Sequence, residues 1–301
     1  MTGEALRVGL IGAGMMGHGM ALNILKAGHP VTVMAHRNRA PIDDLVRNGA
    51  AEAPDPALVA ERSDVVILVL PNSAVVADVI EGERGLVAAG REGLVVGDVT
   101  TGDPSETIRL AGVMAQAGMA LADVPVTRSP REAAEGRLIS LLGGDADTLA
   151  ALRPVLRCYS ESLYEIGPLG SALKLKLINN LLSLGNAAVA CEAAAAAMRS
   201  GVDLSKLHEI ASQGGADSAM MRWIIGRLLE DDESGLRFTL RHARKDLACY
   251  NRMVGETGMP ALLGDMVMQI YGLATALGHG DRFVGGLATI LAEMKDAPDR
   301  D

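Results

Sequence analysis

The chain has 301 residues, of which 49% are hydrophobic and only 2% aromatic, and its formal net charge is −9. This length predicts about two domains, and the hydrophobic content excludes general disorder. The acidic balance argues against nucleic acid as a partner, because neutralising phosphates needs a basic surface.

The N-terminus and the spacing of cysteines indicate the compartment. No basic N-terminal patch precedes a long apolar run, and no run of the roughly 18 apolar residues of a membrane span is expected. We therefore expect a cytoplasmic protein with no membrane partner. The three cysteines and six histidines lack metal-ligand or disulfide spacing, so we expect neither a metal site nor a disulfide framework.

Short β-rich runs alternate with helical stretches in the first half of the chain. The first run, Arg7–Ile11, leads into GAGMMG and a helical stretch, and the second, Pro30–Met34, follows it. Four further strands are predicted: Val65–Leu70, Leu94–Asp98, Met119–Val124 and Ile139–Leu142. Strands that alternate with helices indicate βαβ units and a parallel sheet.

The glycines Gly12, Gly14 and Gly17 form a G-x-G-x-x-G pattern between the first strand and its helix. There the first glycine permits a tight turn, the second lets the backbone approach a pyrophosphate, and the third lets helix and strand pack closely. The helix N-terminus, with Met15 and Met16, offers N–H groups and a positive dipole end to the phosphates. We therefore predict a Rossmann dinucleotide-binding domain; the alternative is a glycine turn without a ligand.

The residues after the second strand bear on the choice of cofactor. An NAD-binding domain usually has an acid there, which holds the ribose 2′-OH. This chain has AHRNR instead, which places His36, Arg37 and Asn38 at the cofactor position. Because Arg37 and Arg39 are suited to a 2′-phosphate, the segment favours NADP over NAD; the alternative is a solvated basic turn.

A long helix is predicted to begin the second half. Ser171 to Arg199 contains no Pro and one Gly and is rich in Ala and Leu, which predicts a helix of roughly 29 residues, or about 44 Å. Gly201 is expected to end this helix, and Arg199 to complement its dipole. Further helices continue to the polar tail KDAPDRD.

Polar residues at helical spacing mark one face of this helix. Lys176, Asn179, Asn180 and Ser183 stand at i, i+3, i+4 and i+7, whereas Lys174 points to nearly the opposite side. Burying four polar groups is costly unless they have a function, although a solvated stripe is the alternative. In hydride chemistry a lysine can deliver the proton to a carbonyl oxygen, and asparagines can orient the carbonyl.

The predicted fold class is α/β, with two domains. Residues 1–166 form an N-terminal Rossmann domain with a doubly wound parallel sheet. Residues 167–301 form an all-helical domain for substrate binding and dimerisation, joined through the long helix. The apolar surface of that helix predicts a homodimer or a homotetramer, in which the helix is buried.

Several separated segments are similar to the β-hydroxyacid dehydrogenase family, which includes the 3-hydroxyisobutyrate dehydrogenases and has a 6-phosphogluconate dehydrogenase-like C-terminal domain. The similarity covers nearly the whole chain in the family's order. The segments are GLIGAGMMGHGMALNILKAGH (9–29), LPNSAVV (70–76), DVTTGDP (98–104), DVPVTRS (123–129), GPLGSALKLKLINN (167–180) and RKDLA (244–248).

This resemblance implies an NAD(P)-dependent oxidoreductase that interconverts a short 3-hydroxy acid and its semialdehyde. It implies that Lys176 is the general acid and base and that Asn179 and Asn180 support it. It implies that Leu70 and Thr101 line the nicotinamide, that Pro71 also binds the cofactor, and that Lys245 approaches the cofactor end of the cleft.

The substrate-binding segment departs from the family's P-V-S-G-G, because here it reads P-V-T-R-S. It resembles the sulfolactaldehyde reductase branch, which implies a sulfonate held by an arginine, an asparagine and a serine. In the alternative, Arg128 faces solvent or pairs with Glu132 or Glu135. The substrate-binding residues expected are Thr127, Arg128, Ser129, Asn179 and Ser183.

The sequence therefore predicts reduction of a small anionic aldehyde, with 3-sulfolactaldehyde as the sharpest hypothesis. That branch tends to use NADH, so NAD stays open beside NADP. Tartronate semialdehyde, 3-hydroxyisobutyrate and succinic semialdehyde are the alternatives with the same chemistry. An alternative of another class is a sensor that binds dinucleotide without turnover.

Overall fold

The structure is a computed structural model that describes residues 5–34, 38–233 and 237–294. The chain divides into two compact units, Met1–Lys176 and Leu177–Asp301. The division predicted from the sequence, after residue 166, lies earlier, just before the long helix α8 (Ser171–Ser200). The two positions differ because backbone groups at the start of α8 bind a side chain of the N-terminal unit.

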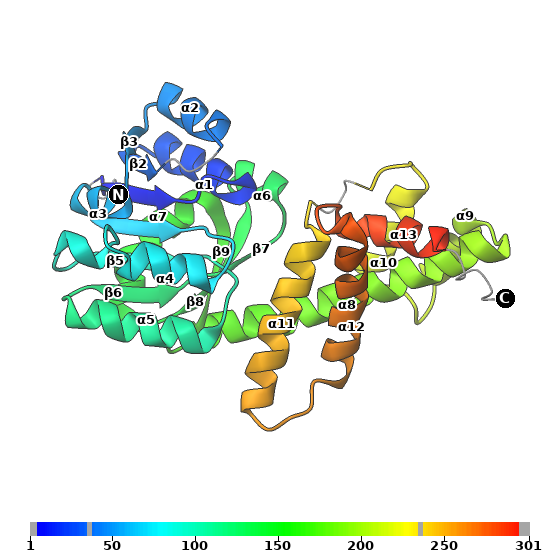
Figure 1. Ribbon diagram of the computed structural model, residues 1–301. Coiled ribbons are helices and arrows are strands. Elements are labelled where there is room, and N and C mark those ends of the chain that lie inside the picture. The colour runs from blue at the N-terminus through cyan, green and yellow to red at the C-terminus, as the bar shows by residue number, and fades with distance from the viewer. Residues whose placement is uncertain (1–4, 35–37, 234–236, 295–301) are drawn as a thin grey trace. The chain divides into compact units, whose positions relative to one another are not determined.

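The described part of the N-terminal unit contains one sheet with nine strands. They are β1 (Val8–Ile11), β2 (Val31–Met34), β3 (Ala51–Ala53), β4 (Val65–Leu68), β5 (Val95–Asp98), β6 (Ala120–Asp123), β7 (Val126–Thr127), β8 (Leu138–Gly143) and β9 (Ser160–Gly167). Their order is β3-β2-β1-β4-β5-β6-β8-β7, with β9 paired to β8 (Figure 1). The pairs from β3 to β6 are parallel, which confirms the doubly wound sheet.

The six strands predicted from the sequence are present, whereas β3, β7 and β9 are not predicted. β3 reads Ala-Glu-Ala, and β7 has only two residues. β9 reads SESLYEIG and is mostly half-exposed or exposed. Such short or polar strands lack the apolar, β-branched pattern that identifies a buried strand.

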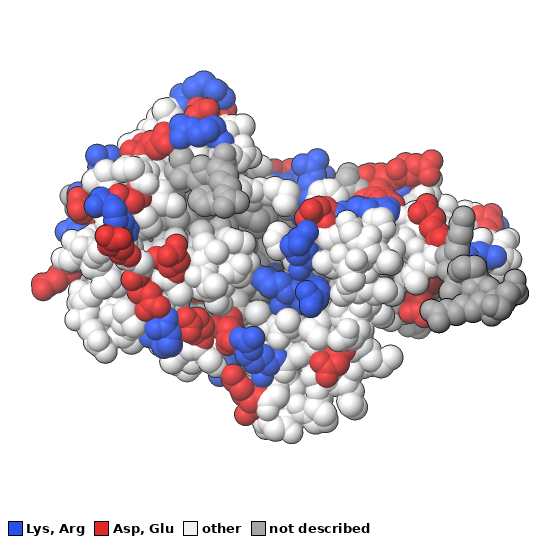
Figure 2. Space-filling model, viewed as in Figure 1, with Lys and Arg blue, Asp and Glu red and all other residues white. Residues whose placement is uncertain are grey.

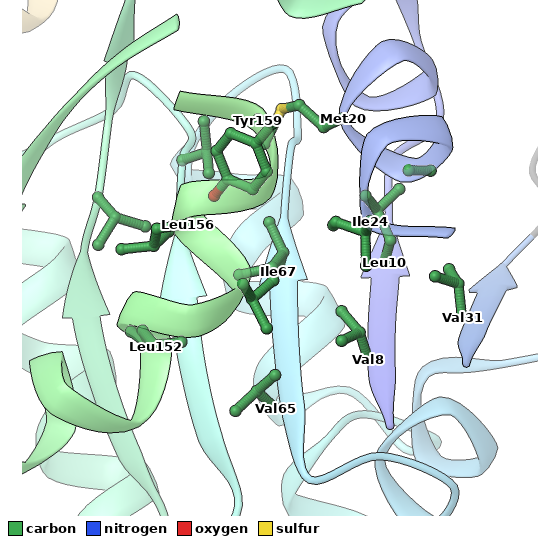
Figure 3. Packing of buried hydrophobic residues seen from close by; sticks show 14 of the residues in the cluster. Val8, Leu10, Met20, Ile24, Val31, Val65, Ile67, Leu152, Leu156 and Tyr159 are labelled. Carbon is green, nitrogen blue, oxygen red and sulfur yellow. The ribbon is translucent and has the colours of Figure 1, made fainter. Parts of the chain in front are cut away.

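Helices cover both faces of this sheet: α1 (Met15–Lys26), α2 (Ala40–Arg47), α3 (Pro56–Glu61), α4 (Ser73–Glu81), α5 (Pro104–Gln116), α6 (Pro130–Ala134) and α7 (Ala146–Tyr159). Val65 and Ile67 pack in the cluster that contains side chains of α1, α2 and α7 (Figure 3). Val66 and Leu68 pack with α3, α4 and α5 in the other cluster. This alternation explains why parallel strands buried on both faces read as continuous apolar runs.

Acidic and basic side chains intermix on the face of the N-terminal unit in Figure 2. Ion pairs are common among the described residues of this unit: Arg109, for example, pairs with Glu81 at 2.5 Å and with Glu106 at 2.7 Å. Exposed pairs of this kind contribute little to stability, because water and salt screen them. Much of the charge on this unit is therefore locally balanced.

The second unit is helical in its described residues. After α8 it contains α9 (Leu204–Ala211), α10 (Ala219–Leu228), α11 (Leu240–Glu256), α12 (Leu262–Ala274), a π-helical turn (Thr275–His279), a 3₁₀ turn (Val284–Gly286) and α13 (Leu287–Glu293). The helical C-terminal domain is thus confirmed. α11 and α12 lie side by side (Figure 1), and small buried residues of α8 such as Ala187 and Cys191 allow close packing against the other helices.

The long helix is one residue longer than predicted. It ends at Gly201, which has φ +74°, while the Val202 N–H donates to the Ala197 carbonyl oxygen at 2.9 Å. The Gly201 N–H donates to the carbonyl oxygen of Met198 at 3.4 Å. Together these bonds form a Schellman motif, which confirms Gly201 as the residue that ends the helix.

By length and composition α8 is long and apolar enough to cross a membrane, so the expectation that no such segment exists is wrong. Its most apolar window has a mean hydropathy of 1.5, and 44% of that window is buried inside the protein. Core helices of globular proteins meet the same criteria, because a helix buried in a core is apolar on most sides.

Candidate functional site

The glycine loop between β1 and α1 contains two positions without room for a side chain. Gly12 has φ +107°, and a Cβ atom there would lie 2.1 Å from the carbonyl oxygen of Val69. A Cβ atom at Gly17 would lie 2.0 Å from the carbonyl oxygen of Gly12. The fold itself therefore requires both glycines, the first for a left-handed turn and the second for close packing of α1.

Gly14 differs, because a Cβ atom there would meet nothing within 4 Å. It precedes α1 and supplies no side-chain cap, so the N–H groups of the first turn have no acceptor within the helix. Room beside a helix N-terminus suits the phosphates of a dinucleotide. An open pocket of about 420 Å³ lies at this turn and is lined by Ala13, Gly14, Met15, His18, Asn38, Ala40, Pro41 and Asp44.

The sequence predicts that Met15 and Met16, the first helical residues, lie at the cofactor. Met15 is 52% exposed and lines the pocket, whereas Met16 packs against the core beside β1. The side chain of Met16 therefore does not face the pocket, and only its backbone N–H lies where the predicted phosphate contact needs it.

The predicted cofactor residues after β2 lie only partly within the described chain. His36 and Arg37 fall outside the described residues. Asn38 lines the pocket, and its Oδ1 accepts a hydrogen bond from the N–H of Ala40 at 3.2 Å. Asn38 therefore both borders the pocket and supports the start of α2.

Carboxylates hold the charged side chains around this pocket. Arg39, a candidate for a 2′-phosphate, donates instead to Glu52 at 2.5 Å and to Asp43 at 2.9 Å. Asp44 lines the pocket and lies 2.9 Å from Nε2 of His18. A carboxylate in this wall suits ribose hydroxyls better than a phosphate, which keeps NAD open beside NADP.

Hydrogen bonds join the loops after β4 and β5 at the carboxyl edge of the sheet. The N–H of Leu70 donates to Oγ1 of Thr100 at 3.0 Å, and the N–H of Asp103 donates to Oγ of Ser73 at 2.8 Å. Ligands of Rossmann domains bind at this edge. Three predicted cofactor residues therefore lie in neighbouring loops at the same edge as the glycine loop: Leu70, Pro71 and Thr101.

Arg128 has φ +82°, in the left-handed region that favours glycine. Its Nη2 donates to Oε1 of Glu161 at 2.8 Å, and its Nη1 donates to the carbonyl oxygen of Arg137. Arg128 therefore forms an ion pair, as in the alternative to substrate binding. Its partner is Glu161 of β9, and not Glu132 or Glu135 as that alternative predicts. The predicted role of Arg128 in binding substrate would require this pair to open.

The neighbours of Arg128 have different surroundings. Thr127 lies half-buried on β7. Ser129 caps α6 in a capping box, in which its hydroxyl donates to Glu132 at 2.5 Å and accepts from the N–H of Arg131 at 3.3 Å. The Ser129 hydroxyl is therefore engaged by the helix, which differs from its predicted role in binding substrate.

The start of α8 is bound by a carboxylate from the sheet. Asp123, at the end of β6, accepts hydrogen bonds from the N–H groups of Gly170 and Leu173, each at 2.7 Å. Burial raises the pKa of Asp123 to about 6, although backbone N–H donors at the helix oppose this shift. Lys176 follows Leu173 by three residues and is half-buried.

The second unit carries the other polar residues of α8. Asn180 is 8% exposed, and its Nδ2 donates to Oδ2 of Asp246 at 2.6 Å. Nζ of Lys245 lies 2.9 Å from Oδ1 of the same carboxylate. Asn179 and Ser183 are half-buried. The structure therefore brings Asn180 and Lys245 together through Asp246.

Two functional candidates are missed by the sequence interpretation, Asp123 and Asp246. Each is at most 2% exposed. Asp123 accepts a hydrogen bond from the backbone just before α8, and Asp246 accepts one from the side chain of Asn180. The available signal was an aspartate at the end of an apolar strand and an aspartate beside the predicted cofactor lysine. Within the described residues, no group of three or more His, Cys, Asp or Glu side chains is placed to hold a metal ion.

Comparison with known proteins matches both units. Residues 7–167 match the NAD binding domain of 6-phosphogluconate dehydrogenase, and residues 170–287 match the NAD-binding domain of NADP-dependent 3-hydroxyisobutyrate dehydrogenase. The chain is 28% identical to 2-(hydroxymethyl)glutarate dehydrogenase of Eubacterium barkeri, over 97% of this chain and 96% of that protein. It is 31% identical to 3-sulfolactaldehyde reductase of Escherichia coli K12, over 91% of each.

A solved structure extends this likeness to the fold. Psf3, solved in complex with NADP+ and 2-OPP, is 26% identical to this chain with a TM-score of 0.83. The match covers 94% of this chain and 99% of that one. Sequence and fold therefore agree over both units.

Proposed function

The chain belongs to the β-hydroxyacid dehydrogenase family of NAD(P)-dependent oxidoreductases, and on this premise we propose that it interconverts a short 3-hydroxy acid and its semialdehyde. The observation that carries the proposal is the polar face of α8. Lys176 is half-buried and Asn180 is buried, and they stand one helical turn apart. A sensor of dinucleotide needs only the glycine loop and has no use for these two groups.

The residues around the glycine loop fit a dinucleotide. The open space at Gly14 and the N–H groups of Met15 and Met16 would hold the pyrophosphate, and Asn38 would border the adenosine end. When bound, the nicotinamide supplies or accepts the hydride. A preference for NADP over NAD depends on His36 and Arg37, since Arg39 is held by carboxylates.

Lys176 would move the proton. In reduction its ammonium donates a proton to the carbonyl oxygen as negative charge develops there, and in oxidation its amine takes the proton back. Asn180 uses Nδ2 to bind Asp246, so its carboxamide orientation is fixed and Oδ1 is left to accept from substrate or lysine. Asn179 and Ser183 offer further donors on the same helix face.

The anionic group of the proposed substrate is a carboxylate or a sulfonate. The choice between them depends on whether Arg128 binds the substrate. Similarity to 3-sulfolactaldehyde reductase supports the sulfonate, whereas the pairing of Arg128 with Glu161 supports a substrate that does not use this guanidinium. We favour a carboxylate semialdehyde, because Arg128 already has a partner.

We expect Arg128→Gly to change kcat/KM for carboxylate semialdehydes by less than about threefold. Stability should change little as well, because relief of the left-handed backbone at this position opposes the loss of a solvent-screened ion pair. Steady-state kinetics and urea unfolding measure both quantities. A loss of more than about tenfold confined to 3-sulfolactaldehyde would assign Arg128 to the sulfonate instead.

Turnover with a substrate panel tests the function directly. Purified protein is mixed with NADPH or NADH and with tartronate, methylmalonate or succinic semialdehyde or 3-sulfolactaldehyde, and the absorbance of the reduced nicotinamide is followed. We expect oxidation of the dinucleotide with tartronate or methylmalonate semialdehyde, each of which is reduced to a 3-hydroxy acid. Tight dinucleotide binding without turnover would favour the sensor.

We also propose that the protein is a homo-oligomer, with α8 buried between copies. Ile178, Leu182 and Val189 are 45%, 63% and 68% exposed and follow one another at spacings of four and seven residues. Such spacing places apolar side chains in one seam along a helix, as in helix pairs that associate. A second copy of the same helix has the apolar surface that would cover this seam.

Leu182→Glu is therefore expected to reduce the assembly to monomers, because a carboxylate in a buried helix seam is strongly unfavourable. Light scattering after size-exclusion chromatography gives the mass, to be compared with the 31.3 kDa chain. Val202→Glu, at an exposed apolar residue just beyond the helix, is the matched control and should leave the mass unchanged. A monomeric native protein would contradict the proposal.

A further inference from the structure

Asp123 connects three parts of the N-terminal unit. It is the last residue of β6, is only 1% exposed, and lies two residues before the segment 125–129 that contains Thr127. A Cβ atom at Gly143 would lie 2.2 Å from Oδ1 of Asp123, so β8 leaves space for the carboxylate by having a glycine there. The carboxylate therefore occupies a site that the surrounding strands are built to accommodate.

Each oxygen of this carboxylate binds a different backbone N–H group at the start of the long helix, one in the residue before it and one in its first turn. Oδ1 accepts from the N–H of Gly170 and Oδ2 accepts from the N–H of Leu173. The two bonds span the first turn of α8, where N–H groups lack acceptors within the helix and the dipole favours a negative charge. This two-point contact fixes both the position and the rotation of the first turn.

We propose that Asp123 is a positioning residue that holds Lys176 in register with the substrate-binding segment 125–129. This inference rests on the proposed function of Lys176 and names a residue through which the fold supports it. Lys176 lies one turn beyond Leu173, so a rotation of the first turn moves the lysine directly. A displacement of about 1 Å at a reacting group can cost about 10²-fold in rate.

Asp123→Asn is the sharpest variant because it preserves size. The amide retains one acceptor oxygen, but its NH₂ group faces an N–H donor, so one of the two contacts is lost. Asp145→Asn is the matched control. Asp145 caps α7 by accepting from the N–H of Thr148 at 2.9 Å and from its hydroxyl at 2.6 Å, and α7 carries no predicted site residue.

We expect Asp123→Asn to lower kcat by about 10- to 100-fold while the dinucleotide Kd stays within about twofold of the native value. Asp145→Asn should change neither. The pH profile of Lys176 acylation, measured by mass spectrometry, should shift in Asp123→Asn, while the exposed Lys174 provides an internal reference that does not shift.

The acylation profile requires no substrate, so it separates this inference from the proposed function. A native protein without turnover would refute the function, yet a shifted Lys176 profile in Asp123→Asn would still support the positioning role. An unchanged kcat together with an unchanged Lys176 profile would overturn that role and reduce Asp123 to a helix cap like Asp145.

If Asp123→Asn does not fold, the native protein provides the test. Burial raises the pKa of Asp123 to about 6, so acidification from pH 7 to about 5 protonates the carboxyl and weakens its bonds to α8. The amide resonances of Gly170 and Leu173 should then titrate, and the resonances of Lys176 should follow with the same midpoint. Lys176 resonances that stay fixed through this titration would overturn the inference.

Discussion

Replacing Lys176 with alanine is expected to lower kcat by about 10²- to 10⁴-fold, because the proton needed at the carbonyl oxygen loses its donor. The dinucleotide Kd should stay within about twofold, since Lys176 lies on α8 and the pyrophosphate is expected at the start of α1. Stopped-flow absorbance of the reduced nicotinamide measures kcat, and isothermal titration calorimetry measures the Kd.

Lys174→Ala is the matched control for this experiment. Lys174 lies on the same helix, is exposed, and points to nearly the opposite side from Lys176. Its replacement should leave kcat within about twofold of the native value, as is usual for surface positions away from a site. Equal activity losses in both variants would indicate a general effect of helix charge and would contradict a specific role for Lys176.

Gly14→Ala is expected to weaken dinucleotide binding by tenfold or more without loss of stability. The new methyl group would meet no protein atom within 4 Å, and the backbone φ of −75° is compatible with alanine. The same methyl group would occupy the space through which the backbone approaches a pyrophosphate. Thermal unfolding and calorimetric titration of NADPH and NADH measure the two effects separately.

Substitutions of two further glycines serve as comparisons for Gly14→Ala. Gly112→Ala in α5 also meets nothing within 4 Å and should leave dinucleotide binding unchanged, with a small gain in helix stability. Gly17→Ala should disrupt the fold itself, because its Cβ would lie 2.0 Å from a carbonyl oxygen. Normal dinucleotide affinity in a folded Gly14→Ala variant would remove the pyrophosphate from this turn.

The parts of the fold that the sequence predicts are those with a strong local pattern. The run VVILVL predicts β4 because a strand buried on both faces must be apolar throughout. α8 is predicted to within one residue because its Ala and Leu content has no interruption before Gly201. In contrast, β9 is an edge strand with polar residues, and only its pairing to β8 defines it.

The functional site is predictable where residues close in sequence cooperate. The glycine loop and the polar face of α8 follow from spacing alone, since helix geometry fixes which residues share a side. The partners of Arg128 and Asn180 do not follow, because Glu161 and Asp246 lie 33 and 66 residues away along the chain. Long-range pairs depend on tertiary packing, which a local pattern does not encode.

Transfer of deuterium from the nicotinamide to the substrate would demonstrate the proposed hydride transfer. The native protein is given tartronate or methylmalonate semialdehyde with NADPH or NADH that carries deuterium at both positions of C4 of the nicotinamide, and the product is examined by NMR. We expect a 3-hydroxy acid with one deuterium on the carbinol carbon, formed in equal amount to the oxidised dinucleotide. Consumption of the dinucleotide without deuterium in the product, or no consumption with any aldehyde of the panel, would rule out the proposed function.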